Sequence, residues 1–204
     1  MIRVFCADIS SADEQTFNRL YACASMERQA RAACCRRRED ALRCVAAEAL
    51  LRYALGTDIG RVEMGPCGKP FLPDRPDFFF NLSHSGNWVV LACGDSEVGV
   101  DVQSLRSNTN PEAMARRFFS PEEQRYVFEK ESCRDQRFFE IWTGKESYLK
   151  YLGTGLGRTL PSFSVLSPEP GIRFHRRKLP DGSLLCLCTT EDEYIWKMVD
   201  VNRL

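Results

Sequence analysis

Residues 98–103 read Val98-Gly99-Val100-Asp101-Val102-Gln103. Their alternation predicts a β-strand, because successive side chains of a strand point to opposite faces. Asp101 and Gln103 therefore share one face, and we expect Val100 and Val102 on the other face to be buried. An acid beside an amide at a strand end can bind Mg²⁺ through its oxygens, although a polar strand end next to a loop is the simpler interpretation.

The residues before this stretch combine helices with further strands. Ser11 and Glu14 have the spacing of a capping box at a helix start. A helix is predicted from Glu39 to a stop at Gly56, because its apolar residues follow helical spacing and glycine commonly ends a helix. Extended segments are predicted at 2–8, 61–64, 78–82, 88–93 and 98–102.

The pattern changes after residue 103. A polar linker is predicted at 104–110, and Ser120-Pro121-Glu122-Glu123 is a strong helix start. Pro180-Asp181-Gly182 predicts a hairpin turn. Helices are expected at 111–118, 121–131 and 135–151, and strands at 162–166, 171–179, 184–190 and 194–201. The sequence therefore predicts an α+β protein with two lobes, 1–103 and 104–204.

Composition and charge exclude several classes of protein. Of 204 residues, 44% are hydrophobic and 27% are charged, which is typical of a globular protein. Lys plus Arg is 28 and Asp plus Glu is 28, so no basic excess favours a nucleic-acid partner. No apolar run is long enough to span a membrane, and the first residues lack the pattern of a signal peptide. We expect a cytoplasmic protein.

The 10 cysteines lack the spacing of a zinc site, because they form no pair of Cys-x-x-Cys motifs and the chain has only 2 histidines. A disulfide scaffold is typical of short secreted chains. We therefore expect the cysteines to be small buried apolar side chains in a reducing compartment.

Residues 142–150 form the most informative part of the predicted helix at 135–151. Trp142, Glu146 and Lys150 follow one face at intervals of four residues. A solvated ion pair between Glu146 and Lys150 is the simpler interpretation of this spacing. Gly144 argues against it, because glycine within a helix is unfavourable unless another group approaches closely.

Two further groups of residues suit contact with phosphate. The predicted loop Ser83-His84-Ser85-Gly86 offers hydroxyl, imidazole and glycine groups, although a Ser–His catalytic pair is an alternative. Arginine binds phosphate through two parallel hydrogen bonds, although a solvated basic face is equally consistent with the pattern. The basic residues are Arg31, Arg36, Arg37, Arg38 and Arg43, together with Lys69 of Gly68-Lys69-Pro70.

Taken together and in this order, these motifs resemble one family. The matching segments are Gly68-Lys69-Pro70, Phe80–Gly86, Val98–Val102, Phe118–Glu123 and Trp142–Lys150. They are similar to the 4′-phosphopantetheinyl transferases of the surfactin-synthetase-activating type, over about residues 38–166. The resemblance implies an α+β pseudo-dimer of two similar lobes with antiparallel sheets and an active site in the cleft between them.

The resemblance also implies a reaction and its partners. The enzyme would move 4′-phosphopantetheine from coenzyme A to a serine of an apo acyl or peptidyl carrier protein and release adenosine 3′,5′-bisphosphate. It would need Mg²⁺ and would act as a monomer. An alternative is a non-catalytic module that binds coenzyme A or a carrier protein.

Roles for individual residues follow from the resemblance alone. Asp101, Gln103 and Glu146 would hold Mg²⁺, with Glu146 also the base for the carrier serine and Lys150 assisting the leaving group. The family usually has an acid where this chain has Gln103, which supplies less charge to the metal. Arg43 would hold the 3′-phosphate of coenzyme A. The other expected coenzyme A contacts are Arg38, Lys69, Pro70, Ser83, His84 and Lys145.

Overall fold

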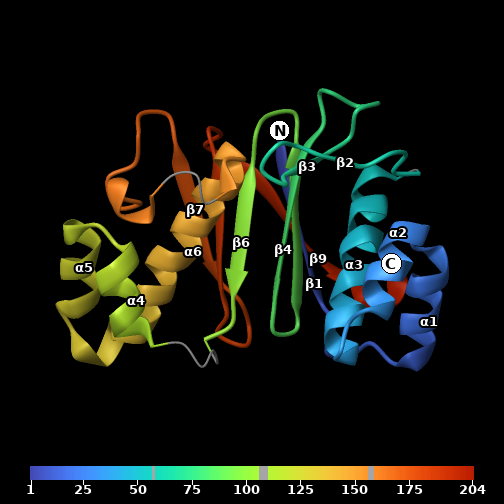
Figure 1. Ribbon diagram of the computed structural model, residues 1–204, viewed down its shortest axis with the longest axis horizontal. Helices are drawn as coiled ribbons and strands as arrows, with labels where there is room; N and C mark the ends of the chain where they lie inside the picture. Colours follow the sequence, from blue (N-terminus) through green and yellow to red (C-terminus); the bar gives the residue numbers. More distant parts are fainter. Residues whose placement is uncertain (57, 106–109, 156–158) are drawn as a thin grey trace.

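The computed structural model describes residues 1–56, 58–105, 110–155 and 159–204, arranged in four layers (Figure 1). A helical layer covers one side of a four-stranded sheet, the first sheet. The second sheet, of three strands, packs on the other side and is covered in turn by the second helical layer. Helices combined with mostly antiparallel strands confirm the predicted α+β class.

The elements of the two halves are as follows. The first sheet and its helices comprise β1 (Ile2–Asp8), α1 (Glu14–Cys23), α2 (Met26–Ala33), α3 (Arg38–Leu55), β4 (Phe79–Ser85), β5 (Trp88–Gly94) and β9 (Tyr194–Asp200). The second sheet and its helices comprise β6 (Gly99–Gln103), α4 (Pro111–Phe118), α5 (Pro121–Phe128), α6 (Arg134–Leu152), β7 (Arg173–Lys178) and β8 (Leu184–Thr189). The short strands β2 (Glu63–Met64) and β3 (Pro70–Phe71) pair with each other, and 3₁₀ turns lie at Glu131–Cys133, Leu160–Ser162 and Val201–Arg203.

The first sheet joins the two ends of the chain. Its strand order is β4-β5-β1-β9, and that of the second sheet is β6-β8-β7. Adjacent strands run antiparallel except β1 and β9, which run parallel. Because β9 lies near the end of the chain, the first sheet includes a strand from beyond the expected boundary at residue 103.

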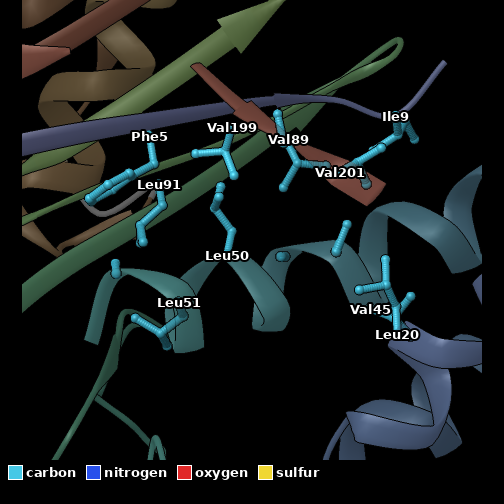
Figure 2. Packing of buried hydrophobic residues seen from close by; sticks show 14 of the residues in the cluster. Phe5, Ile9, Leu20, Val45, Leu50, Leu51, Val89, Leu91, Val199 and Val201 are labelled. Carbon is cyan, nitrogen blue, oxygen red and sulfur yellow. The ribbon is translucent and has the colours of Figure 1, made fainter. Parts of the chain in front are cut away.

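Three hydrophobic clusters separate the four layers. Figure 2 shows Leu50 and Leu51 of α3 near Leu91 of the first sheet, and Val45 of the same helix beside Leu20 of α1. A second cluster lies between the two sheets, and a third lies between the second sheet and α4–α6.

Alternation along single strands builds two of these clusters at once. In β1, Phe5 and Ala7 face α3, whereas Val4 and Cys6 face the second sheet. In β6, Val100 and Val102 are buried between the sheets, as predicted. The opposite face of β6 is thus left for Asp101 and Gln103.

The chain caps its helices largely as the sequence predicts. Gly56 and Gly153 end α3 and α6 in the left-handed conformation, with φ of 68° and 64°. Ser120 and Glu123 form the capping box of α5. The capping box expected from Ser11 and Glu14 is wrong: α1 starts at Glu14, and the Asp13 side chain accepts the hydrogen bond from Thr16 N–H.

Two predicted segments differ from the structure. Ser83–Ser85 belong to β4 rather than to a loop, and the hairpin turns at Gly86 and Asn87. No strand forms at 162–166, a fully described range, because side chains of α5 bind this segment instead: Val165 N–H donates to Glu123 and Ser164 Oγ to Glu122. Of the predicted linker, residues 106–109 lie outside the described residues.

All 10 cysteines are described, and each is free. Cys6, Cys93, Cys186 and Cys188 are buried, as expected for small apolar side chains, but the other cysteines are partly or fully exposed. Burial raises the pKa of the Cys186 thiol to about 11, so this thiol stays protonated at neutral pH.

Candidate active site

Helix α6 lies directly on strand β6. A Cβ atom at Gly99 would come within 2.0 Å of Ser147 O and 2.3 Å of Tyr151 N, so only glycine fits at this crossing. The contact fixes the distance between the polar face of β6 and the last two turns of α6. Residues from these two elements form the candidate site.

Strand β4 joins β6 through its side chains rather than through its backbone. β4 and β6 are the edge strands of the two sheets, and an edge strand leaves a row of N–H groups unpaired. The donors on β6 and just after it are Val100, Val102 and Ser104, and they donate respectively to the side chains of Asn81, Ser83 and Ser85. We call this row of hydrogen bonds the side-chain ladder.

The Asp101 carboxylate lies at the centre of the site and is almost completely buried. Its Oδ1 accepts hydrogen bonds from Lys150 Nζ at 2.6 Å and from Ser83 Oγ at 2.9 Å. Its Oδ2 accepts one from Gln103 Nε2 at 3.0 Å. Asp101 and Gln103 thus share a face of β6, as predicted.

Glu146 and Lys150 approach Asp101 from α6. Lys150 Nζ also donates to Ser83 Oγ at 3.0 Å and to Val100 O at 3.1 Å, so it binds both edge strands. Burial, and then the negative charge of Asp101, raise the pKa of Glu146, although Lys150 opposes the shift. A carboxylate with a raised pKa is a better proton acceptor near neutral pH.

A cavity of about 270 Å³ opens beside these residues. Glu146 and Lys150 form one wall. The other described lining residues are Cys67, Gly68, Lys69, Pro70, Asn81, Leu82, Leu149, Gly153 and Gly155. The cavity therefore lies where β3 and β4 meet the end of α6. Four predicted site residues line it, namely Lys69, Pro70, Glu146 and Lys150.

Lys69 contacts both the segment before β6 and the end of α6 beside this cavity. Its Nζ is 2.5 Å from Glu97 Oε2 and donates to Val98 O at 3.0 Å and Tyr151 O at 2.9 Å. It therefore links β3 to the end of α6, and its side chain forms part of the cavity wall.

Further positive charge lies at the β4–β5 turn. Arg43 donates from α3 to Gly86 O at 2.5 Å and pairs with Asp40. The His84 side chain is exposed on β4. Loss of hydration, and then the charges of Arg43 and Lys150, lower the pKa of His84, so its imidazole is neutral at pH 7. These groups can bind an anion that lies across β4.

Two predicted contacts lie elsewhere. Arg38 packs over the Phe17 ring and lies 3.7 Å from Glu14, on the surface of the first helical layer. Lys145 is completely buried, 2.7 Å from Glu123, and donates to Leu160 O and Phe163 O. The structure does not bring Lys145 to the cavity.

The arrangement also includes residues that the sequence analysis passed over. Gly99 and Asn81 have no reactive group, and their roles depend on elements distant in sequence. Gly144 was expected to allow close approach, and a Cβ there would lie 3.1 Å from Val165 Cγ2. Glycines inside a predicted strand or helix are the sequence signal for such contacts.

The chemistry of the donors suits a hard cation. Asp101, Glu146 and Gln103 offer carboxylate and amide oxygens, which Mg²⁺ prefers. In the described part of the chain, no three His, Cys, Asp or Glu residues gather as a metal site. The oxygens of two carboxylates and one amide nevertheless fit a magnesium ion that keeps some of its ligands as water or substrate oxygens.

Comparison with known proteins identifies the family. The 4′-phosphopantetheinyl transferase superfamily matches residues 97–198. A 4′-phosphopantetheinyl transferase of Bacillus subtilis is 36% identical over 194 residues, which cover 89% of this chain and 82% of that protein. The chain belongs to the 4′-phosphopantetheinyl transferase superfamily. This confirms the resemblance drawn from the motifs.

Two more relatives extend the comparison. The transferase Sfp of Bacillus subtilis strain 168 is 36% identical over 170 residues, 76% of this chain and 72% of that protein. The transferase HetI of a Nostoc species is 36% identical over 145 residues, 65% of this chain and 61% of that protein. The part of this chain that matches the superfamily, residues 97–198, contains Asp101, Glu146 and Lys150.

Proposed function

We propose that the protein transfers 4′-phosphopantetheine from coenzyme A to a serine of an apo acyl or peptidyl carrier protein. The observation that carries this proposal is that Glu146 and Lys150 line one cavity while Lys150 also pairs with Asp101 behind it, in a chain of the transferase superfamily. The alternative of a non-catalytic binding module explains neither the raised pKa of Glu146 nor the pairing of the partly exposed Lys150 with the buried Asp101 carboxylate.

The reaction needs a base, a stabilised leaving group and positive charge on the pyrophosphate. The serine oxygen of the carrier forms a bond to the phosphorus that bears pantetheine, and the bond from this phosphorus to the bridging oxygen breaks. Glu146 accepts the serine proton. The bridging oxygen leaves with adenosine 3′,5′-bisphosphate, and Lys150 stabilises its negative charge.

Asp101, Glu146 and Gln103 would hold Mg²⁺. When bound, Mg²⁺ neutralises charge on the pyrophosphate oxygens. Asp101 is fixed by its three donors, so its carboxylate keeps one orientation. Because Gln103 is neutral, this set supplies less negative charge than three carboxylates would.

The basic groups and the neutral His84 imidazole around β4 would bind the phosphates of coenzyme A. Arg43 would hold the 3′-phosphate, and His84 and Lys69 would contact coenzyme A phosphates; Arg43 lies at the β4–β5 turn, and Lys69 lines the cavity together with Pro70. Lys145 is left out of this set, because its side chain is completely buried. Arg38 is also left out, because it packs over the Phe17 ring on the surface of the first helical layer.

We further propose that the protein works as a monomer in the cytoplasm. The free cysteines agree with a reducing compartment. Within the described residues, no helix combines the length and apolar character that crossing a bilayer requires.

The proposal is tested by incubating the protein with coenzyme A, Mg²⁺ and a panel of apo carrier proteins from fatty-acid, polyketide and nonribosomal peptide systems. Mass spectrometry should show the gain of one phosphopantetheine on the carrier serine, with equimolar adenosine 3′,5′-bisphosphate. Binding of coenzyme A without conversion of any carrier would favour the binding module.

Removal of the metal tests the magnesium assignment separately. Excess chelator should abolish transfer, and Mg²⁺ or Mn²⁺ should restore it, because both ions favour oxygen ligands. Full activity in excess chelator would contradict the metal role of Asp101 and Glu146.

A further inference from the structure

A second and larger cavity adjoins the candidate active site. Its volume is about 430 Å³, against about 270 Å³ for the cavity beside Glu146. Its walls come from β3, the segment between β3 and β4, the start of β4 and the end of α6. We call it the phenylalanine cavity, because the side chains of Phe71, Phe78, Phe79 and Phe80 line it. The proposed transfer reaction makes no use of this space.

The two cavities share a wall. Lys69, Pro70 and Gly153 line both of them. The aliphatic part of Lys69 lies against Gly153, where a Cβ atom would come within 3.1 Å of Lys69 Cδ. Lys69 Nζ contacts Glu97 and donates to Val98 O and Tyr151 O, and these bonds hold the side chain in place. A ligand in one cavity can therefore bind without entering the other.

The phenylalanine cavity presents aromatic rings that the fold covers only in part. Phe71 is 42% exposed, and Phe78 and Phe79 are half-buried. The rings of Phe78 and Phe80 lie 6.2 Å apart between their centroids. Aromatic rings prefer neighbouring rings at about 4.5–7 Å, and removal of apolar surface from water is favourable. A flat aromatic group in the cavity would meet both preferences.

The charged residues of the phenylalanine cavity favour an anion. Of the described lining residues, Lys69, Arg75 and Glu97 are ionisable. Lys69 and Glu97 form an ion pair with each other, so the charge of Arg75 remains in the balance of these three. A guanidinium has five N–H donors, and Arg75 can therefore bind a carboxylate in addition to its 3.4 Å contact with Asp58 O.

We propose that the phenylalanine cavity is a binding site for a small aromatic carboxylate. The ring lies among the phenylalanine side chains, and the carboxylate binds Arg75. The cavity volume falls in the range of about 300–1,000 Å³ that is typical of small-molecule sites. This site is separate from the one that would hold coenzyme A, and its binding can be measured without a carrier protein.

The first test is calorimetric titration of the protein with 2-naphthoate, and with 2-naphthamide as a neutral compound of the same shape. We expect one 2-naphthoate per chain with a Kd of about 1 mM or lower, which is the affinity that ligands of this size commonly reach. The amide should bind at least about fivefold more weakly, because it cannot form a charge-assisted pair with Arg75. Absence of saturable 2-naphthoate binding, or equal affinities for the two compounds, would overturn the proposal.

Variants at exposed or half-buried positions test where the probe binds. Arg75→Gln should weaken 2-naphthoate binding at least about fivefold and leave 2-naphthamide binding unchanged. Its control is Arg61→Gln, since Arg61 is an exposed arginine of the same segment that pairs with Glu63. Phe71→Ser should weaken the binding of both compounds about three- to tenfold. Its control is Met64→Ser in the adjacent strand β2, where Met64 is 57% exposed.

Both control variants should bind 2-naphthoate within about twofold of the parent, with folding of all variants checked by thermal unfolding. Parental affinity in both Arg75→Gln and Phe71→Ser would place the probe outside the phenylalanine cavity and overturn the proposal. Losses in the control variants as large as those in Arg75→Gln and Phe71→Ser would do the same.

Competition with coenzyme A distinguishes the two cavities. At saturating coenzyme A, the Kd of 2-naphthoate should change by less than about twofold, because Lys69 and Gly153 separate the two ligands. Displacement of 2-naphthoate in proportion to bound coenzyme A would place the probe in the cavity beside Glu146 and overturn the proposal. Failure of the proposed function would look different, because the protein would then convert no carrier while its binding of 2-naphthoate followed the variants as described.

Discussion

Two lysines of α6 form carboxylate pairs that differ in their surroundings. Lys145 and Glu123 are 2.7 Å apart, and both side chains have 0% exposure. Lys150 and Asp101 are 2.6 Å apart, but the Lys150 side chain is 28% exposed and lines the cavity. The Lys145–Glu123 pair is therefore part of the protein interior, whereas the Lys150–Asp101 pair lies at the cavity.

The partners of each ammonium explain the difference in role. Lys145 donates to Glu123, Leu160 O and Phe163 O, which uses the three donors of an ammonium where water and substrate cannot enter. Lys150 also has several partners, but its side chain is partly exposed and lines the cavity, so the proposed reaction requires it to exchange one partner for a substrate oxygen. Proximity of opposite charges alone does not identify a reactive lysine.

Lys145→Met should have the largest effect on stability. It leaves the Glu123 carboxylate buried without its counter-charge, which predicts a loss of about 3–5 kcal/mol in the free energy of unfolding. Denaturant unfolding measures this loss, and the kcat of the folded fraction should stay near the parental value. A stable variant with low kcat would reverse the roles of the two lysines.

Gly99→Ala and Gly144→Ala together compare two close contacts of α6: that of its backbone with Gly99 of β6, and that of its Gly144 with the Val165 side chain. The new methyl group would overlap the backbone of α6, so we expect a loss of at least about 2 kcal/mol in stability. Gly144→Ala meets only the Val165 side chain, and better helix propensity offsets this contact to within about 1 kcal/mol. Thermal unfolding of the two variants under one condition measures the contrast, which equal losses would refute.

Lys150→Met should change the rate more than the stability. Loss of one charge-assisted contact to the leaving oxygen predicts a fall in kcat of about ten- to a hundredfold. The KM for coenzyme A should change little, because the charge matters most as the leaving oxygen becomes anionic. Steady-state kinetics and denaturant unfolding of the same samples measure these effects. A large loss of stability with an unchanged kcat would contradict the prediction.

Gln103→Glu should have the smallest effect on activity among these variants. Gln103 lies beside the Lys150–Asp101 pair, because its side chain donates to Asp101. A third carboxylate should lower the Mg²⁺ concentration for half-maximal rate by about three- to tenfold, because more negative ligand charge strengthens binding. A magnesium titration at saturating coenzyme A measures the change. An unchanged midpoint would place Gln103 outside the metal site.

The sequence predicts the fold class and most of the site because both depend on local patterns. Alternation in 98–103 places Asp101 and Gln103 on one face of β6. The expectation that Lys145 contacts coenzyme A came from the resemblance alone; successive residues of a helix turn by about 100°, so Lys145 lies off the face shared by Glu146 and Lys150, and the structure buries it against Glu123. The family motif alone does not make this distinction.

Contacts between distant segments could not be predicted from the sequence. The pairing of β9 with β1 depends on the order of strands in a sheet, which local pattern does not specify. Residues 162–166 have strand-like composition, yet Glu122 and Glu123 bind them from α5. Ser83 was expected in a phosphate-binding loop, because the extent of β4 becomes clear only from its register with β5.

The central claim is that Glu146, beside the Asp101–Lys150 pair, acts as the base for carrier modification. The most direct test is the single-turnover rate of Glu146→Gln at saturating Mg²⁺, followed by the mass of the carrier, with folding checked by thermal unfolding. The amide retains the size and one ligating oxygen but cannot accept a proton at neutral pH. The account predicts a rate about 10²–10⁴-fold below that of the parent. A folded Glu146→Gln protein that modifies the carrier at the parental rate would contradict it.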